Sequence, residues 1–551
     1  MSRRHALIVL MAVYLEGAPM LLSQEAGAKL ELNQASEVYA ALPNDPEGQK
    51  LAQVVHFETR PGSYVEGVLE SAGAALELYL EAPGGAEQRR LLTDVVSSQS
   101  FRFVATRDRY QLRLTSSTKG ASGSIKLRRN VPQEEFLERK KTTPNWEPVS
   151  PTLKKMLVAE DSEGAVASFW KNRLVEGTPM VEADPEGDPE MRLVTFLWRG
   201  ALENVLLVGP PASDHVWMRP LGDTDIWFAS FRVRRDLRLS YQLAPDIPLI
   251  PGNAREQRMA LLATAQVDPL NLYPFLPSAT DKFDQMSYAA LDMAPKQPGY
   301  PVQNTDYDLE ELFFDSAILK SGRRIWIQSP AGFDPENPDN LLLVLFDGAR
   351  YSLESPTAGM LTTLQKDGLL PPVVVVYIDS LDPKRRMHEL TCNEAFQEAV
   401  ATEVVPFALA HVGMVHNRDR TVVAGSSLGG LASSCLAIRQ PEVFGNFISM
   451  SGSYWWSPKT FPAVNLPYMT HVAHSIGSQN IRAVFAAGRF ETSRHTDSVG
   501  IFEASRRLAA ALRDIGYPEV HWFPYEGGHD YAIWRGALTE GLIALFGDTG
   551  K

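Results

Sequence analysis

The sequence predicts an α/β domain in its carboxyl-terminal half, preceded by two small all-β units. From residue 309 onward, apolar runs without alternation are separated by helical stretches, which is typical of a parallel sheet buried on both faces. Before residue 309, short runs alternate between apolar and polar residues, with Gly, Pro and Ser between them, as in antiparallel sandwiches. The length of 551 residues favours about three units rather than one core.

Composition excludes several classes of function. Hydrophobic residues at 44% and charged residues at 22% are ordinary globular values, and they do not indicate a multi-span membrane protein. The net charge of −13, with no basic block, argues against a nucleic-acid partner. Cys392 and Cys435 form no metal-ligand pattern and no disulfide framework, so we expect buried thiols.

The first 28 residues have the layout of a secretory signal peptide. Residues 2–5 are basic, residues 6–15 are apolar, and Ala-Gly-Ala at 26–28 offers small residues for cleavage. We therefore expect an exported, periplasmic protein that begins near Leu30 and has no membrane span after cleavage. An uncleaved membrane-tethering segment is the alternative.

Residues 29–131 are expected to form the first β-sandwich. Alternation at 64–70, 76–80 and 110–114 predicts its strands, and no catalytic cluster accompanies them. The polar, proline-bearing stretch 132–160 is predicted to be a linker. The first sandwich should then be a structural or adhesive module whose removal, up to about Ser150, leaves an active enzyme.

Residues 161–295 are expected to form the second β-sandwich. Its predicted strands lie at 193–198, 205–208, 225–230 and 239–243, with Trp198 and Trp227 as core anchors. Such units are similar to the carbohydrate-binding-like modules of many hydrolases. The segment 254–308, which is rich in Pro, Asp and Tyr, should cross the surface as an extended connection.

Residues 309–551 are expected to form the α/β domain. Helical stretches such as 393–410 and 502–515 separate its strands, and the active site should lie at the carboxyl ends of those strands. The strands are predicted at 323–328, 341–346, 373–378, 421–423, 447–450 and 482–486.

One of these strands runs into a nucleophile elbow. Gly425, Ser427 and Gly429 fit G-x-S-x-G, which places a serine on a sharp turn between a strand and a helix. Ser427 would project from the sheet, and the backbone N–H of Leu428 would face a developing oxyanion. A second oxyanion donor should follow an earlier strand, and the N–H of Ala349 is our choice.

The serine needs a base and an acid. His529 lies on a glycine-bearing loop directly after a short strand, whereas His471, His474 and His495 have no such placement and should lie on the surface. Glu491 directly follows the strand before it and is the preferred acid, with Asp497 in reserve. The order serine, acid, histidine is that of α/β-hydrolases.

At this point the chain resembles the enterochelin (enterobactin) esterase family. The motifs include Asp347-Gly348 after an apolar strand, the stretches 386–393, 421–431, 451–456 and 527–530, and the pair Trp534-Arg535. Weaker likeness continues upstream at 194–199, 223–227 and 268–271, so the resemblance covers about 168–546 and leaves out the first 150 residues. Ser426 and Leu428 stand where relatives often have Gln and Phe.

The resemblance implies a serine esterase that hydrolyses the ester bonds of ferric catecholate siderophores, with no cofactor and no resident metal. Ser427, His529 and Glu491 match the family's catalytic positions, of which the acid is the most variable. A secreted acyl or feruloyl esterase acting on polysaccharide, and a non-catalytic binder of siderophores or glycans, are the alternatives. Arginines and aromatics on the site loops could pair with catecholate oxygens and stack on rings; these are Arg350, Arg386, Trp455, Trp456, Trp534 and Arg535.

Overall fold

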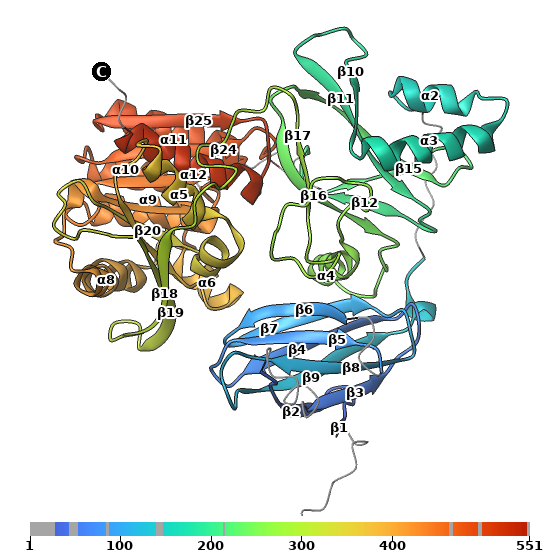
Figure 1. The fold of residues 1–551 in the computed structure, drawn as a ribbon, viewed down its shortest axis with the longest axis horizontal. Coiled ribbons are helices and arrows are strands. Elements are labelled where there is room, and N and C mark those ends of the chain that lie inside the picture. The colour runs from blue at the N-terminus through green and yellow to red at the C-terminus, as the bar shows by residue number, and fades with distance from the viewer. Residues whose placement is uncertain are drawn as a thin grey trace, which may run out of the picture.

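The computed structural model describes residues 28–42, 53–83, 88–138, 147–212, 215–461, 467–493 and 499–547. It contains two β-sandwiches and an α/β domain, which lie against one another (Figure 1). The expected signal peptide lies outside the described residues except at its last position. Among the described helices, none is both long and apolar enough to cross a membrane.

The first sandwich consists of two antiparallel sheets that enclose an apolar core. One sheet has the order β1-β3-β8-β5-β6, in which only the short β1 pairs in parallel, and the other has the order β2-β9-β4-β7. Alternate residues point inward in strands such as β5, where Leu76, Leu78 and Leu80 are buried. The strands are β1 Ala28–Lys29, β2 Ala35–Tyr39, β3 Val54–Glu58, β4 Tyr64–Ser71, β5 Leu76–Glu81, β6 Gln88–Val95, β7 Ser98–Val104, β8 Arg109–Thr115 and β9 Ser122–Val131.

The second sandwich has two four-stranded sheets, ordered β10-β11-β15-β14 and β13-β12-β16-β17. Trp198 and Trp227, expected as core anchors, are partly buried and pack against its core. Its strands are β10 Met180–Ala183, β11 Met191–Arg199, β12 Val205–Val208, β13 Val216–Trp217, β14 Arg219–Pro220, β15 Ile226–Arg234, β16 Arg238–Pro245 and β17 Ser287–Ala290.

Two expectations about the connections need correction. The stretch 132–160 carries the short 3₁₀ helix η1 (Gln133–Glu135) and the helix α2 (Pro151–Leu157), which packs with α3 (Ser162–Glu176) against the second sandwich. The segment 254–308 begins as the helix α4 (Ala254–Thr264), not as extended chain. The Asn253 side chain caps α4 in a capping box with Glu256, a local signal that the Pro and Tyr content of the segment obscured.

The α/β domain confirms the prediction of a mostly parallel sheet. Its eight strands have the order β18-β19-β21-β20-β22-β23-β24-β25, and every pairing from β21 to β25 is parallel. Only the hairpin β18–β19 runs antiparallel. The strands are β18 Tyr307–Ser316, β19 Ser321–Pro330, β20 Leu341–Phe346, β21 Val373–Ile378, β22 Thr421–Ser426, β23 Asn446–Met450, β24 Arg482–Gly488 and β25 Glu519–Tyr525.

Helices cover both faces of this sheet and give it two apolar cores. One core packs against α7 to α11, and the other packs against α5 and α12, so central strands such as β20 are buried at every position. The helices are the π-helix η2 Arg350–Glu354, α5 Thr357–Lys366, α6 Pro383–Glu389, α7 Glu394–Ala399, the π-helix η3 Val400–Val404, α8 Val405–Val412, the 3₁₀ helix η4 Arg418–Arg420, α9 Leu428–Arg439, α10 Tyr468–Ile476, α11 Ile501–Ile515 and α12 Tyr531–Phe546.

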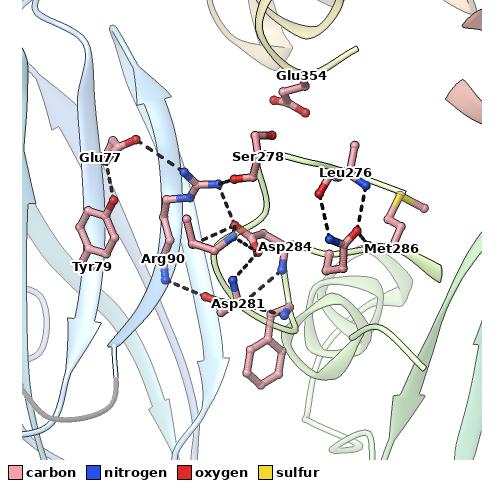
Figure 2. A network of polar contacts seen from close by, with 12 residues as sticks. Glu77, Tyr79, Arg90, Leu276, Ser278, Asp281, Asp284, Met286 and Glu354 are labelled. Carbon is pink, nitrogen blue, oxygen red and sulfur yellow. Dashed lines mark hydrogen bonds and ion pairs between the residues drawn. The ribbon is translucent and has the colours of Figure 1, made fainter. Parts of the chain in front are cut away.

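The first sandwich is docked on both other units, and the expectation that its removal leaves an active enzyme stays a prediction. Tyr64 joins Ile250, Ala260 and Ala263 of the second unit in one buried apolar cluster. Beside it, Arg90 pairs with Asp284 at 2.8 Å and donates to other oxygens of the same loop (Figure 2). Burial of apolar surface at a junction stabilises the junction, so truncation at about residue 150 would expose the apolar cluster.

Candidate active site

The elbow serine lies where the structure forces an unusual backbone. Ser427 has φ 58° and ψ −118° between β22 and α9, a region that non-glycine residues rarely occupy. A Cβ on Gly425 would lie 2.6 Å from the backbone of Gly429, so only glycine fits there. The Ser427 N–H donates to the Met450 carbonyl at 2.9 Å, and Ser453 N donates to the Ser427 carbonyl at 2.9 Å. Bonds on both sides hold the strained turn.

The structure brings the three expected catalytic side chains together from three different strand ends. His529 Nε2 lies 3.0 Å from Ser427 Oγ, and His529 Nδ1 lies 2.5 Å from Glu491 Oε1. Ser427 follows β22, Glu491 follows β24 and His529 follows β25. Because these strands are parallel, their carboxyl ends meet at one edge of the sheet. A hydroxyl, an imidazole and a carboxylate in this order are equipped for acyl transfer.

Glu491 is held in place as a hydrogen-bond acceptor. Its side chain is only 2% exposed, and its second oxygen accepts the Gly488 N–H at 2.9 Å. The imidazole of His529 is 40% exposed, so a substrate can reach it. A carboxylate on Nδ1 holds that proton there and leaves Nε2 as the acceptor that a general base needs.

The histidine loop is packed from both sides. The Trp534 ring meets the His529 ring edge to face at 4.8 Å, and Trp534 Nε1 donates to Ser451 Oγ at 2.8 Å. A Cβ on Gly527 would lie 2.7 Å from the Arg238 carbonyl of β16, in the second sandwich. The second sandwich therefore contacts the loop that carries the base.

The loop with the expected second oxyanion donor is anchored by Asp347. This residue directly follows β20, has φ 58°, and precedes Gly348 and Ala349. Arg386 on α6 grips its carboxylate with two hydrogen bonds, Nε at 2.6 Å and Nη2 at 2.7 Å. Ser380 Oγ also donates to Asp347, at 2.8 Å. Leu428 opens α9, so its N–H has no acceptor within the helix and can serve an oxyanion.

Arg386 was expected to contact the substrate; its bidentate pair with Asp347 engages Nε and Nη2, and direct contact with the substrate stays a prediction. The alternative was an ion pair of Arg386 with Glu389 or with a neighbouring carboxylate. The partner is the neighbouring carboxylate of Asp347, because Glu389 pairs with Arg323 through two bonds at 2.8 and 2.9 Å. Sequence reasoning saw Asp347 as part of a motif but missed it as the partner of Arg386. The sequence feature that could have pointed to Asp347 is an Asp followed by Gly directly after a buried strand.

Trp534 and Arg535, also expected to bind substrate, are both buried in the structure. Trp534 is buried against His529, as described above. Arg535 is 3% exposed, its Nε donates to Gln297 at 2.7 Å, and its guanidinium lies 3.9 Å from the centre of the Tyr300 ring. Both lie in the amino-terminal half of α12, which is buried at every position from Ala532 to Thr539.

Of the remaining expected binding residues, Trp455 and Arg350 are accessible. Trp455 is 55% exposed and follows Ser453, whose Oγ lies 3.3 Å from Ser427 Oγ. Arg350 directly follows Ala349 and pairs with Glu354. Trp456 packs against Tyr468 at 5.6 Å and belongs to the edge of the core.

Two expected alternatives, Asp497 and His495, lie outside the described residues. His471 and His474 are exposed on α10, where His471 meets Ser475 of the same helix. Cys392 and Cys435 form a disulfide with their Cα atoms 5.7 Å apart, so the expectation of separate thiols is wrong. Their separation of 43 residues gave no local sign of the pairing.

Two models of known protein families match this chain. Residues 193–300 match the family model "Enterochelin esterase, N-terminal", and residues 316–545 match "Putative esterase". The iron(III) enterobactin esterase of Escherichia coli strain K12 is 32% identical over 378 residues, which cover 66% of this chain and 89% of that protein. The chain belongs to the enterochelin esterase family.

Other members of the family agree in structure and sequence. A crystal structure of the enterobactin esterase from Shigella flexneri in the presence of enterobactin has a TM-score of 0.55 and 31% identity, and covers 69% of this chain and 97% of that one. The iron(III) salmochelin esterase of Escherichia coli O6:H1 is 29% identical and covers 69% and 94%. As a member of this family with an α/β-hydrolase domain, the protein is a carboxylic ester hydrolase.

The pair between Arg386 and Asp347 leads to a first prediction. Arg386→Met keeps aliphatic bulk but leaves the buried Asp347 carboxylate with Ser380 alone, so the loop of Ala349 should shift. We expect kcat to fall by about 10- to 100-fold for a small neutral p-nitrophenyl ester and for a siderophore alike. A rise in KM for the ferric siderophore alone would instead show direct contact between Arg386 and the ligand.

Asp530 leads to a second prediction, on pH. Burial raises the pKa of Asp530 from 3.8 to about 7, although its Oδ1 accepts the Ala532 N–H at 2.6 Å and caps α12. A raised folded-state pKa gives stability that is complete below the unfolded pKa and is lost as the pH rises through the folded pKa.

We therefore expect this group to lower the free energy of unfolding by about 1.4 kcal/mol per pH unit between about pH 4 and 7. Asp530→Asn keeps the capping oxygen and removes the titration, so urea midpoints at pH 5, 6, 7 and 8 should fall less for the variant. A constant difference between the two proteins across this range would contradict the raised pKa.

Proposed function

We propose that the protein hydrolyses the ester bonds of ferric catecholate siderophores of the enterobactin type. The observation that carries the proposal is the array of Ser427, His529 and Glu491, set in a chain whose relatives are iron(III) enterobactin and salmochelin esterases. The iron enters as part of the substrate. Among the described residues, no group of three or more His, Cys, Asp or Glu side chains could hold a metal ion.

In the proposed reaction, Ser427 Oγ attacks the ester carbonyl carbon while His529 Nε2 takes the hydroxyl proton. The N–H groups of Leu428 and Ala349 stabilise the oxyanion, and Glu491 stabilises the imidazolium through Nδ1. His529 then gives its proton to the leaving alkoxide, which departs as an alcohol. Water activated by the same imidazole attacks the acyl-serine, and this step releases the acid and restores Ser427.

Recognition of a multiply negative ligand by a chain of net charge −13 requires cations that act at contact. With Arg386 engaged by Asp347, the exposed candidates beside the site are Arg350 and the ring of Trp455. Guanidinium groups pair with catecholate oxygens, and an indole offers a face on which a catechol ring can stack.

The substrate class is tested by comparing the full-length protein on ferric enterobactin and on feruloylated arabinoxylan. We expect the siderophore to be cleaved and the polysaccharide ester to be left intact, with both activities followed by chromatography of the released acids. Ser427→Ala is the control for contaminating esterases. Preference for the feruloyl ester would replace the siderophore with a polysaccharide substrate.

We also propose that the protein is exported to the periplasm. The support is the basic, apolar and small-residue order of residues 1–28, together with the Cys392–Cys435 disulfide, since disulfides persist in oxidising compartments. Mass spectrometry of protein from a periplasmic fraction should find a new N-terminus near Leu30. Intact Met1 on protein confined to the cytosol would contradict export.

A further inference from the structure

The first sandwich touches the α/β domain through the end of β6 and the turn that leads from it to β7. There Asp94 grips Arg324 of β19 through both carboxylate oxygens, with Nη2 at 2.6 Å from Oδ2 and a second short bond from Nη1. Three residues further on, Ser97 Oγ lies 3.4 Å from the Asp382 carboxylate, at the start of α6. In Figure 1 the hairpin β18–β19 projects from the α/β domain toward the first sandwich.

Arg324 joins the end of β6 to a loop of the α/β domain. Its Nε and Nη2 also donate to Asp379, at 3.1 and 2.8 Å, and the whole residue is 8% exposed. Asp379 is the first residue after β21, at the edge of the sheet where the candidate active site lies. One buried guanidinium therefore binds a carboxylate from each unit, and bidentate pairs of this kind set geometry as well as energy.

The loop that begins at Asp379 is the one that holds Asp347. Ser380, the next residue, donates to the Asp347 carboxylate, and Arg386 grips it from α6. Asp382 caps the start of α6 through the N–H groups of residues 384 and 385, and so sets the direction from which Arg386 reaches Asp347. The first sandwich thus reaches both ends of the support beneath Ala349, one through Arg324 and the other through Ser97.

We propose that Asp94 of the first sandwich is a positioning residue for ester hydrolysis, which acts through Arg324 and Asp379 on the loop that holds Asp347 and Ala349. The inference rests on the proposed role of the Ala349 N–H in the oxyanion hole. It makes the first sandwich part of the catalytic architecture, although neither family match begins before residue 193.

Loss of the Asp94 carboxylate should not leave the Arg324 guanidinium without an anionic partner, because Arg324 keeps its bonds to Asp379. The variant Asp94→Asn is therefore expected to fold, with the loop free to relax by a fraction of an ångström. Small displacements of an oxyanion donor slow the chemical step without weakening the binding of a small substrate.

The test uses the full chain and p-nitrophenyl butyrate. Asp94→Asn should lower kcat about 10-fold and leave KM within about 2-fold, because the oxyanion contact forms only in the transition state. Inactivation by diethyl p-nitrophenyl phosphate, in which Ser427 Oγ bonds to phosphorus and p-nitrophenolate leaves, should slow by a similar factor. Asp94→Glu keeps the charge and should recover part of the rate.

The matched control is Asp284→Asn. Asp284 pairs with Arg90 of the same sandwich, but it docks that sandwich on the second unit and not on the α/β domain (Figure 2). We expect this variant to keep the wild-type kcat and the wild-type rate of inactivation. Equal losses in Asp284→Asn and Asp94→Asn would overturn the proposal, since docking in general would then be responsible.

An unchanged kcat in Asp94→Asn, with only a lower melting temperature, would overturn it as well and leave the pair as a docking contact. In that case Ser427→Ala, tested in parallel, decides whether the proposed catalytic function stands by itself. If Asp94→Asn does not fold, Asp94→Glu is measured in its place. Its side chain is longer by one methylene, so a kcat and an inactivation rate that both equal those of the wild type would count against positioning by Asp94.

Discussion

Ser427→Ala should reduce the turnover of p-nitrophenyl butyrate and of ferric enterobactin by about 10⁴-fold or more while the protein stays folded. The variant removes the only atom that can form the acyl-enzyme in the proposed mechanism. His529→Ala should cost a similar factor, since Ser427 Oγ has His529 Nε2 as its proton acceptor at 3.0 Å. Initial rates, with circular dichroism to verify folding, measure both effects.

Groups that act as a unit lose activity non-additively, so the double variant should be no slower than either single one. Ser453→Ala is a useful comparison. The Ser453 Oγ lies 3.3 Å from Ser427 Oγ, but it has no part in the proton transfer that we propose. Near-normal turnover in Ser427→Ala or His529→Ala would dispose of the mechanism. A 10⁴-fold loss in Ser453→Ala would show that the proton leaves Ser427 by another route.

Glu491→Gln should have the next largest effect, a fall in kcat of about 10- to 10⁴-fold with little change in KM. The amide keeps the size of the side chain, but its NH₂ group can meet His529 Nδ1 only as a donor. The imidazole would then carry its proton on Nε2, facing Ser427, and could not act as a base. The short contact of 2.5 Å between Oε1 and Nδ1 makes the tautomer strongly dependent on this residue.

The same variant also tests the choice of acid. Glu491 is 2% exposed at the side chain and already accepts the Gly488 N–H, so it is held for this contact. Asp497, the reserve from the sequence, lies outside the described residues. If Asp497→Asn does more damage than Glu491→Gln, the acid assignment is wrong, whatever the fold of the loop between them.

The large features of the fold were open to prediction because they depend on local patterns. Continuous apolar runs such as Leu341–Phe346 could be stable only between two layers of helices, and alternating runs such as Leu76–Glu81 only on a half-buried sheet. The elbow could also be predicted from a short window, because the backbone of Gly429, four residues further on, leaves no room for a Cβ at Gly425. The helix α4 was missed because its proline-rich surroundings outweighed a capping box only four residues long.

The partners of individual charged side chains were not open to prediction in the same way. Arg386 and Arg535 both lie in motifs of the family, yet one pairs with Asp347, 39 positions away, and the other with Gln297, 238 positions away. The disulfide joins residues 43 positions apart. Such pairs form when strand order brings distant loops to one edge, and no short window of sequence contains that order.

By itself the sequence determined the class of the catalytic domain, the serine on its elbow and the candidates for base and acid, because backbone sterics and side-chain periodicity act over a few residues. Only the tertiary structure decided which arginine pairs with Asp347 and which tryptophan packs against His529. It also decided that Asp94 contacts the catalytic domain through Arg324. The physical reason is that an ion pair or ring contact needs two groups within a few ångströms. That proximity is set by the packing of whole units against one another.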